Sequence, residues 1–377
     1  MTLEPTPTSR RGFLALAPAV CLAAGMDSPA HAAQQPAPSP LEEEIRRLAD
    51  DAPLRLRFRG TTAEECRKWQ TAFAEALRSS LGAYQPPAKW QMTVERVVER
   101  DDHRREELLL TAPGQRPLPV YLLTPKDKRR GQRAGIVALH GHGRFGYDAI
   151  VARELTPGIE KAVKSANYDY GLQLVRRGYV VAAPCLTPFG RRLGDPAAYR
   201  NQDPCAITFL RMQLLGKVLI AENLRDVLWA VELLARHKQV DARRLGCVGL
   251  SYGGRMTMLA TALEPRLRAA VVSGALNCMQ ERVAVRYSCG AQIIPGLLQY
   301  GDVPETGGLI APRPCLWQAG TRDALMVPRW IDLAMRRIGQ AYIALGAKEQ
   351  LQLDRFDGGH VWHGERAYPF LEKALRG

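Results

Sequence analysis

Ser251 lies between two glycines in the segment 249–253, which reads Gly-Leu-Ser-Tyr-Gly. The apolar run 245–250 before it is typical of a strand, and the segment 254–264 after it is typical of a helix. A serine on a sharp strand-to-helix turn exposes its hydroxyl for nucleophilic attack, and the two glycines give the turn its space. The pentapeptide alone arises by chance with a probability on the order of 0.1 in a chain of this length. Its position between a strand and a helix therefore carries the prediction that Ser251 is a nucleophile rather than a capping serine in a glycine-rich loop.

The strand, serine and helix in this order resemble the α/β-hydrolase family, whose members place an acid and then a histidine after the nucleophile. The resemblance implies that Asp323 is the acid, because GTRDALMVP follows a predicted strand at 314–320 in the manner of the family's acid loop. Asp302 precedes that strand and is the weaker candidate. Asp332 and Asp354 fall in a predicted helix and a predicted strand, where we expect solvated charges.

The same resemblance implies that His360 is the catalytic histidine. It lies in FDGGHVWHG, directly after the last predicted strand, on a loop with two glycines. His363 in the same segment is the competing candidate, and otherwise a surface histidine or one that supports its neighbour. His360 would take the proton of Ser251 and return it to the leaving alcohol. Asp323 would orient the imidazole and stabilise its charged form.

Backbone donors for an oxyanion are also implied by the resemblance. The family places one at the N–H after the nucleophile, here Tyr252, and another in the loop after an early strand. That loop reads LHGHGRFG, follows the predicted strand 134–139 and resembles the family's HG-x signature. We expect the second donor to be the backbone of His142, with Gly143 as the alternative. Loss of one such donor costs about 3 kcal/mol of transition-state stabilisation.

Other side chains near these loops have types that could bind a ligand. His140 and His142 form an H-x-H pair, which holds a metal in other hydrolases, but H-x-H-x-D-H is absent and we expect neither a metal site nor a cofactor. Arg144 and Arg255 are candidates for binding a substrate carboxylate or sugar oxygens. Trp362 could stack on a sugar or pack against the histidine loop.

A narrower resemblance covers residues 116–377, which are similar to dienelactone-hydrolase-like and acetyl-xylan-esterase-like proteins. The likeness is strongest in 216–254, in 289–314, and in the acid and histidine loops. Dienelactone hydrolase itself uses a cysteine nucleophile, whereas this chain has Ser251. That difference indicates an ester substrate rather than lactone chemistry.

Apolar runs and helical segments alternate along this stretch. The pattern predicts an α/β fold with a mostly parallel twisted central sheet and helices on both faces. Two long connections, 185–215 and 277–313, interrupt the alternation. Both begin at carboxyl ends of predicted strands, where α/β sheets bind their ligands, so we expect them to shape the pocket. The predicted strands are 134–141, 179–184, 245–251, 268–276, 314–320 and 349–356.

Residues 1–32 resemble a twin-arginine export signal, because SRRGFL and an apolar stretch precede a small-residue cleavage site, AHA. The apolar stretch is too short to span a membrane and no other run reaches roughly 18 apolar residues, so no membrane insertion is expected. Residues 33–40 are a proline-rich linker, 41–115 an N-terminal helical arm with a strand meander, and 116–377 the α/β-hydrolase catalytic domain.

Charge and cysteine content narrow the possible partners. The net charge is +14, but the arginines are scattered and no basic run alternates with aromatics, so nucleic acid is not predicted as a partner. Attraction to polyanions or anionic substrates is the alternative. Eight cysteines include Cys21 of the export segment and no C-x-x-C. The seven others are odd in number and predict no disulfide framework. If any pair forms, Cys185–Cys205 or Cys278–Cys289 is expected.

These patterns together predict a periplasmic or secreted serine hydrolase that cleaves a carboxylic ester through an acyl-enzyme. An acetyl ester of a carbohydrate, small or oligomeric, is the expected substrate. One alternative is a peptidase of the prolyl-oligopeptidase type, although 33–115 is too short for that group's usual propeller domain. A non-catalytic binding protein on the same fold and a polyanion-binding protein are further alternatives.

Replacement of Arg10 and Arg11 by lysine should retain the precursor in the cytoplasm, because the twin-arginine route requires the arginine pair. Fractionation and immunoblotting would measure the distribution. The same exchange at Arg46 and Arg47 is the control and should leave export unchanged. Undiminished export of the Arg10→Lys, Arg11→Lys variant would contradict the assignment.

Overall fold

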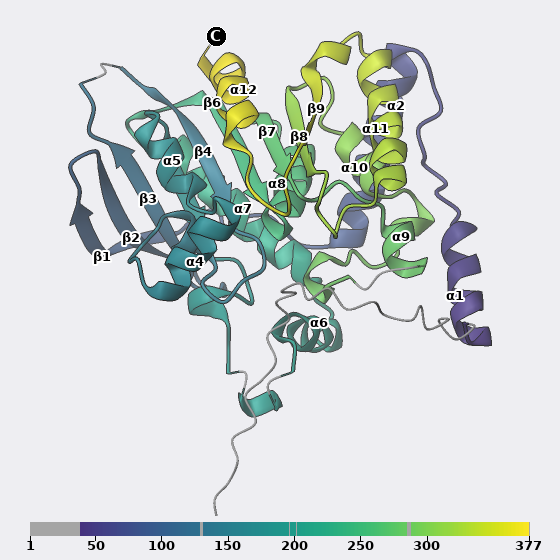
Figure 1. The fold of residues 1–377 in the computed structure, drawn as a ribbon, viewed down its shortest axis with the longest axis horizontal. Helices are drawn as coiled ribbons and strands as arrows, with labels where there is room; N and C mark the ends of the chain where they lie inside the picture. Colours follow the sequence, from purple (N-terminus) through teal and green to yellow (C-terminus); the bar gives the residue numbers. More distant parts are fainter. Residues whose placement is uncertain (1–37, 129–130, 196, 201, 285–287, 377) are drawn as a thin grey trace, which may run out of the picture.

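A single sheet organises the molecule. The computed structural model describes residues 38–128, 131–195, 197–200, 202–284 and 288–376 (Figure 1). Within these residues the strands form one nine-stranded sheet of order β1-β2-β3-β5-β4-β6-β7-β8-β9. The strands are β1 (Gln91–Glu99), β2 (His103–Thr111), β3 (Leu118–Pro125), β4 (Arg133–Leu139), β5 (Val180–Pro184), β6 (Val240–Leu250), β7 (Leu267–Ser273), β8 (Cys315–Gly320) and β9 (Leu351–Phe356).

The strands from β5 to β9 along this order pair in parallel, whereas β1, β2 and β3 are antiparallel and β3 pairs antiparallel with β5. The predicted α/β class with a mostly parallel sheet is therefore confirmed. The expected strand meander is the antiparallel edge of the same sheet. The boundary expected between residues 115 and 116 falls in the connection between β2 and β3, which pair with each other.

Helices cover both faces of the sheet. Successive side chains of β4 belong alternately to two apolar clusters, one on each face of the sheet. Val137 and Leu139 pack in the first cluster, and Ile136 and Ala138 pack in the second. The first cluster includes side chains of α2, α7, α8 and α11, and the second those of α5 and α12. The helices are α1 (Pro40–Asp50), α2 (Ala63–Leu81), α3 (Tyr147–Ile150), α4 (Pro157–Ala166), α5 (Tyr170–Arg176), α6 (Pro204–Leu214), α7 (Leu219–Ala235), α8 (Tyr252–Leu263), α9 (Met279–Ala284), α10 (Val303–Gly308), α11 (Pro328–Ala344) and α12 (Gly364–Arg376).

The expected helical arm packs on the α/β domain. Helices α1 and α2 lie at the end of the molecule opposite β1 and β2 (Figure 1). The amide of Gln70 donates to the carbonyl oxygens of Gly308 (3.2 Å) and Ala311 (2.8 Å), and the thiol of Cys66 lies 3.7 Å from the carbonyl oxygen of Ala341. These contacts join α2 to the α10–α11 region.

The expected export signal lies outside the described residues, as does most of the proline-rich linker. Within the described residues, no single helix is long and apolar enough to cross a membrane. Helices α6 and α7 reach that length and hydropathy only as a joined pair, which is bent by 99°.

The turn from β6 into α8 brings three backbones together. A Cβ atom on Gly253 would lie 1.9 Å from the carbonyl oxygen of Leu139, and one on Gly249 would lie 2.4 Å from the carbonyl carbon of Gly253. The neighbouring atoms belong to backbone, so they cannot rotate away. Both glycines are therefore required by the close approach of α8 to the ends of β4 and β6.

The Gly253→Ala variant should lose about 3 kcal/mol of unfolding free energy, because the added methyl must displace the backbone of β4. Gly339→Ala on α11 is the matched control, since its Cβ would meet only Leu351 Cδ2 at 3.9 Å. The control should be neutral or gain up to about 1 kcal/mol from the less flexible unfolded chain. Urea unfolding would measure both, and equal stabilities would contradict the packing described.

Candidate active site

Ser251 lies at the sharp turn between β6 and α8. Its backbone has φ 64° and ψ −122°, in the positive-φ region that residues other than glycine rarely adopt. Its N–H donates to the carbonyl oxygen of Ser273 at the end of β7 (2.9 Å). This bond and the packing around Gly249 and Gly253 maintain the conformation, which is the one that exposes a nucleophile in a strand–serine–helix turn.

The structure pairs His360 with Asp323. His360 Nδ1 is 2.6 Å from Asp323 Oδ2, and Asp323 Oδ1 accepts the N–H of Leu325 (2.9 Å). The carboxylate side chain is 1% exposed and follows β8, while His360 follows β9. Gly274 leaves room for the ring, because a Cβ there would lie 2.7 Å from His360 Cε1. The carboxylate thus fixes the imidazole from one side.

The other nitrogen of this imidazole is free to react. His360 Nε2 is buried and has no hydrogen-bond partner among the described residues, Ser251 included. His360 and Ser251 line one cavity of about 220 Å³. A second hollow of about 250 Å³, between the segment 187–195 and α6, is lined by neither of them. The first cavity is lined by His142, Gly143, Phe145, Gly146, Ala149, Ala162, Ser165, Ala166, Tyr168, Leu250, Ser251 and His360.

The loop after β4 lies against the serine turn. A Cβ on Gly141 would be 2.7 Å from the carbonyl oxygen of Leu250 and 2.9 Å from Ser251 Cβ. The Gly141 N–H already donates to the hydroxyl of Tyr168 (2.6 Å). Beyond this residue, His142 and Gly143 line the cavity. Tyr252 is the first residue of α8, so its N–H has no acceptor within the helix.

His140 supports this loop through hydrogen bonds at both of its ring nitrogens. Its Nε2 accepts the N–H of Leu186 (2.9 Å), so its Nδ1 carries the proton and donates to the carbonyl oxygen of Gly141 (2.8 Å). Burial lowers the pKa of His140 to about 4, so the ring is neutral near pH 7. Both ring nitrogens are occupied, which excludes the H-x-H pair as a joint metal-binding unit.

Asn223 on α7 is a supporting residue that the sequence did not indicate. Its Oδ1 accepts the N–H of Thr187 (2.8 Å), and its Nδ2 donates to the Thr187 carbonyl oxygen and the Tyr252 hydroxyl (both 2.7 Å). The side chain is fully buried. It therefore ties the residue after Ser251 to the connection that follows β5.

The competing histidine has a carboxylate of its own. His363 Nδ1 is 2.7 Å from Asp354 Oδ2, and the ring stacks on Phe356 with 4.4 Å between centroids. Gln318 donates to the same carboxylate oxygen (2.9 Å) and to the carbonyl oxygen of His363 (2.6 Å). The expectation that Asp354 is a solvated charge is wrong, because its side chain is 7% exposed and paired. His363 is not among the residues that line the 220 Å³ cavity.

The weaker acid candidate, Asp302, has a different structural task. It is fully buried and caps α10 by accepting the N–H of Val303 (2.6 Å). It also accepts the N–H groups of Met279 (2.6 Å) and Gln280 (3.1 Å). Its carboxylate therefore joins the start of α9 to the start of α10.

The three predicted substrate-binding side chains differ in position. Arg144 is exposed beside the cavity-lining residue Phe145, with its guanidinium carbon 6.0 Å from that ring's centroid. Arg255 is 2% exposed and donates to Asn277, and burial lowers its pKa to about 10. Trp362 is 1% exposed and stacks on Tyr170 with 4.8 Å between centroids. Arg255 and Trp362 are therefore interior residues in this structure.

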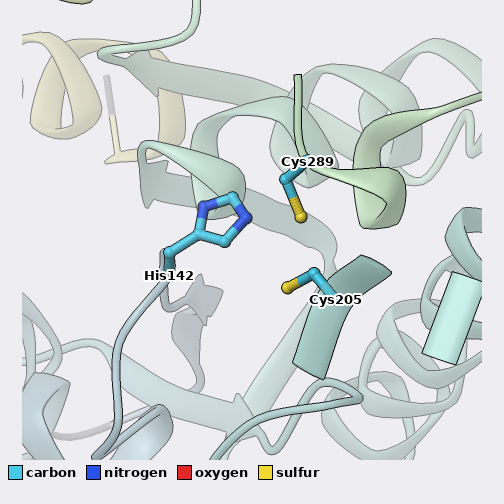
Figure 2. Close-up of side chains that lie close together, drawn as sticks. All are labelled: His142, Cys205 and Cys289. Atoms are coloured by element: carbon cyan, nitrogen blue, oxygen red, sulfur yellow. The ribbon is translucent and has the colours of Figure 1, made fainter. Parts of the chain in front are cut away.

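The cysteine pairs expected from the sequence are not formed. All seven cysteines in the described residues are free. Cys205 instead lies beside Cys289, and His142 completes the group (Figure 2). A hydrogen bond with Cys205 lowers the pKa of the Cys289 thiol, and the same bond raises the pKa of the Cys205 thiol. The two pairs were expected only if a disulfide formed, and neither brings together Cys205 and Cys289, which lie in the two long connections whose meeting the sequence does not reveal.

The sheet order, the strand–serine–helix turn and the helices on both faces define the α/β-hydrolase fold. Residues 219–278 match the model of the prolyl oligopeptidase family. A relative named "Putative hydrolase YtaP" from Bacillus subtilis (strain 168) is 27% identical over 292 residues, which cover 74% of this chain and 91% of the relative.

Solved structures share the fold. A protein titled "putative acetyl xylan esterase" from Bacteroides fragilis has a TM-score of 0.69 at 17% identity, over 83% of this chain and 81% of its own. A glucuronoyl esterase from Solibacter usitatus has a TM-score of 0.61 at 16% identity, over 84% of this chain and 94% of its own.

Asn223→Ala should lower the unfolding free energy by about 3 kcal/mol, because it leaves buried groups of Thr187 and Tyr252 without partners. Tyr252→Phe removes only one of the three hydrogen bonds and should cost about 1 kcal/mol. Urea unfolding at neutral pH would measure both variants. A Tyr252→Phe variant as unstable as Asn223→Ala would contradict the conclusion that the Asn223 amide stabilises both Thr187 and Tyr252.

Proposed function

We propose that the protein is a serine hydrolase that cleaves a carboxylic ester through an acyl-enzyme, with Ser251 as nucleophile, His360 as base and Asp323 as the orienting acid. The observation that carries the proposal is the state of His360. Its Nδ1 is held 2.6 Å from a buried carboxylate, while its Nε2 is unpartnered and the ring lines one cavity with Ser251. A histidine in this state is ready to accept the proton of an attacking hydroxyl.

The reaction follows from these positions. The Ser251 hydroxyl attacks the ester carbonyl as His360 Nε2 takes its proton, and Asp323 stabilises the resulting imidazolium. The backbone N–H groups of Tyr252 and of His142, or of Gly143 in its place, donate to the oxyanion. His360 then protonates the leaving alcohol, and water, activated by the same histidine, releases the acid from Ser251.

The cavity supports a short acyl group. Its volume of about 220 Å³ is below the roughly 300–1,000 Å³ of drug-sized ligand sites. Its lining includes several small residues, among them Ala149, Ala162 and Ala166. An acetyl group fits these limits, and the likeness to an acetyl xylan esterase supports a carbohydrate as the alcohol part. Of the three predicted substrate-binding residues, Arg144 is the exposed one, and it lies next to the cavity-lining residue Phe145. We therefore propose that Arg144 contacts the sugar.

The site of action is proposed from the first 32 residues. Their arginine pair, apolar stretch and AHA segment support export by the twin-arginine route to the periplasm or beyond. An esterase in that place would meet polymeric or oligomeric carbohydrate esters. No cofactor is needed for the reaction described.

A peptidase is the second candidate, because residues 219–278 match the prolyl oligopeptidase model. The same catalytic residues would serve an amide bond. A panel of p-nitrophenyl acetate, butyrate and decanoate, acetylated xylan and peptide anilides separates the two functions. Turnover of the short esters and of xylan, with little on decanoate and the anilides, is the expected result. Preferential cleavage of anilides would favour the peptidase.

The Ser251→Ala and His360→Gln variants should lose at least about a thousandfold in kcat/KM for p-nitrophenyl acetate, because each removes a member of one catalytic unit. His363→Gln is the matched control, since that histidine also pairs with a buried aspartate but does not line the cavity. It should keep its activity within about tenfold of wild type. A His363→Gln loss as large as that of His360→Gln would contradict the assignment, as would full activity of Ser251→Ala.

A further inference from the structure

Three potential metal ligands from distant parts of the chain meet beside the candidate active site. His142 comes from the loop after β4, Cys205 from the first turn of α6, and Cys289 from the residue before the 3-10 turn η3 (Gly290–Gln292). One ligand atom of each lies within 4.8 Å of those of the others. Figure 2 shows the imidazole and the two sulfur atoms directed toward a common space.

The surrounding contacts fix the three segments. A Cβ on Gly290 would lie 2.6 Å from Phe209 Cβ, so α6 and η3 are in close contact next to the two cysteines. The His142 ring packs against both Phe189 and Tyr252, with centroid separations of 5.5 and 5.3 Å, and these two rings also contact each other. Cys205 is 4% exposed and Cys289 is half-buried, whereas His142 is exposed. The group is thus held by packing and open on the imidazole side.

We propose that His142, Cys205 and Cys289 form a binding site for a thiophilic divalent cation, Zn²⁺ in the first instance. Two thiolates and an imidazole are a typical zinc ligand set, and three protein ligands leave a fourth position for water or another oxygen. Ligand atoms around tetrahedral zinc lie about 3.5–3.8 Å apart, given bonds of about 2.0–2.3 Å. In this structure the three ligand atoms lie within 4.8 Å of one another, and rotation of the side chains would bring them to the shorter distances of a zinc site.

Binding changes the charge of the site in a defined way. Both cysteines bind as thiolates, so each proton that a thiol still carries passes to solvent, and the two negative charges neutralise the charge of the cation. His142 is also the residue whose backbone is proposed to bind the oxyanion, so the metal would fix the oxyanion loop to both long connections. That consequence rests on the proposed function, but metal binding itself does not.

The test uses the reduced full-length chain, freed of metal by a chelator and titrated with Zn²⁺, with Co²⁺ as a spectroscopic substitute. The proposal predicts one metal ion per chain by elemental mass spectrometry. It also predicts a thiolate-to-cobalt charge-transfer band. His142→Ala, Cys205→Ser and Cys289→Ser should each weaken binding by about tenfold or more.

Cys66→Ser is the matched control, because its hydroxyl can keep the contact with the Ala341 carbonyl oxygen and the site is remote from Cys66. It should bind metal as wild type does. Ser251→Ala should also bind metal, which separates failure of this site from failure of the catalytic proposal. His142→Ala changes an exposed side chain, so it should fold normally. It therefore tests the site even if the cysteine variants fail to fold.

Any of three results would overturn the proposal. The first is a wild-type chain that binds no more zinc than the Cys205→Ser, Cys289→Ser double variant. The second is unaltered affinity in His142→Ala together with no charge-transfer band. The third is a Cys205–Cys289 disulfide that persists under reducing conditions and excludes zinc.

Discussion

The close approach of the loop after β4 to the turn at Ser251 is the contact on which the site depends. Gly253 must lack a side chain because the carbonyl oxygen of Leu139 occupies its place, and Gly141 must lack one because Leu250 and Ser251 do. At this contact the backbone of Ser251 has φ 64°, and the loop after β4 lies against the serine turn. The proposed nucleophile and the proposed oxyanion donors thus acquire their relative positions from the ends of strands rather than from flexible loops.

Two histidine–aspartate pairs lie at the ends of β8 and β9, and their surroundings differ. In the pair formed by Asp323 and His360, the second imidazole nitrogen is unpartnered in the described residues and its ring lines the cavity. In the pair formed by Asp354 and His363, a glutamine amide and a stacked phenylalanine surround the group. Distance to a carboxylate alone therefore does not single out the proposed catalytic histidine; the unpartnered nitrogen and the cavity beside it do.

The parts of the fold that follow from local patterns were predictable from the sequence. Continuous apolar runs gave β4, β5 and β8, because parallel strands buried on both faces have no polar alternation. Strand β6 begins earlier than its apolar run, at Val240, because Arg133 of β4 pairs with that residue. The acid and histidine loops were found because each directly follows a strand.

Contacts between distant segments could not be predicted in the same way. The amide of Asn223 joins residues 36 and 29 positions away, and nothing in the sequence around it marks a buried polar residue. Cys205 and Cys289 meet because two long connections pack together, and neither connection has a periodic pattern that fixes its path. Trp362 lies in the histidine loop, two residues after His360, yet its ring packs in the core against Tyr170.

Ser251 is proposed to be the activated serine, and a fluorophosphonate reagent would show whether it is. The reagent forms a stable bond with a serine whose proton is removed by a neighbouring base. Peptide mass spectrometry of the labelled protein should place the adduct on Ser251, at one label per chain. An adduct on another serine, or no adduct on a folded chain, would contradict the account.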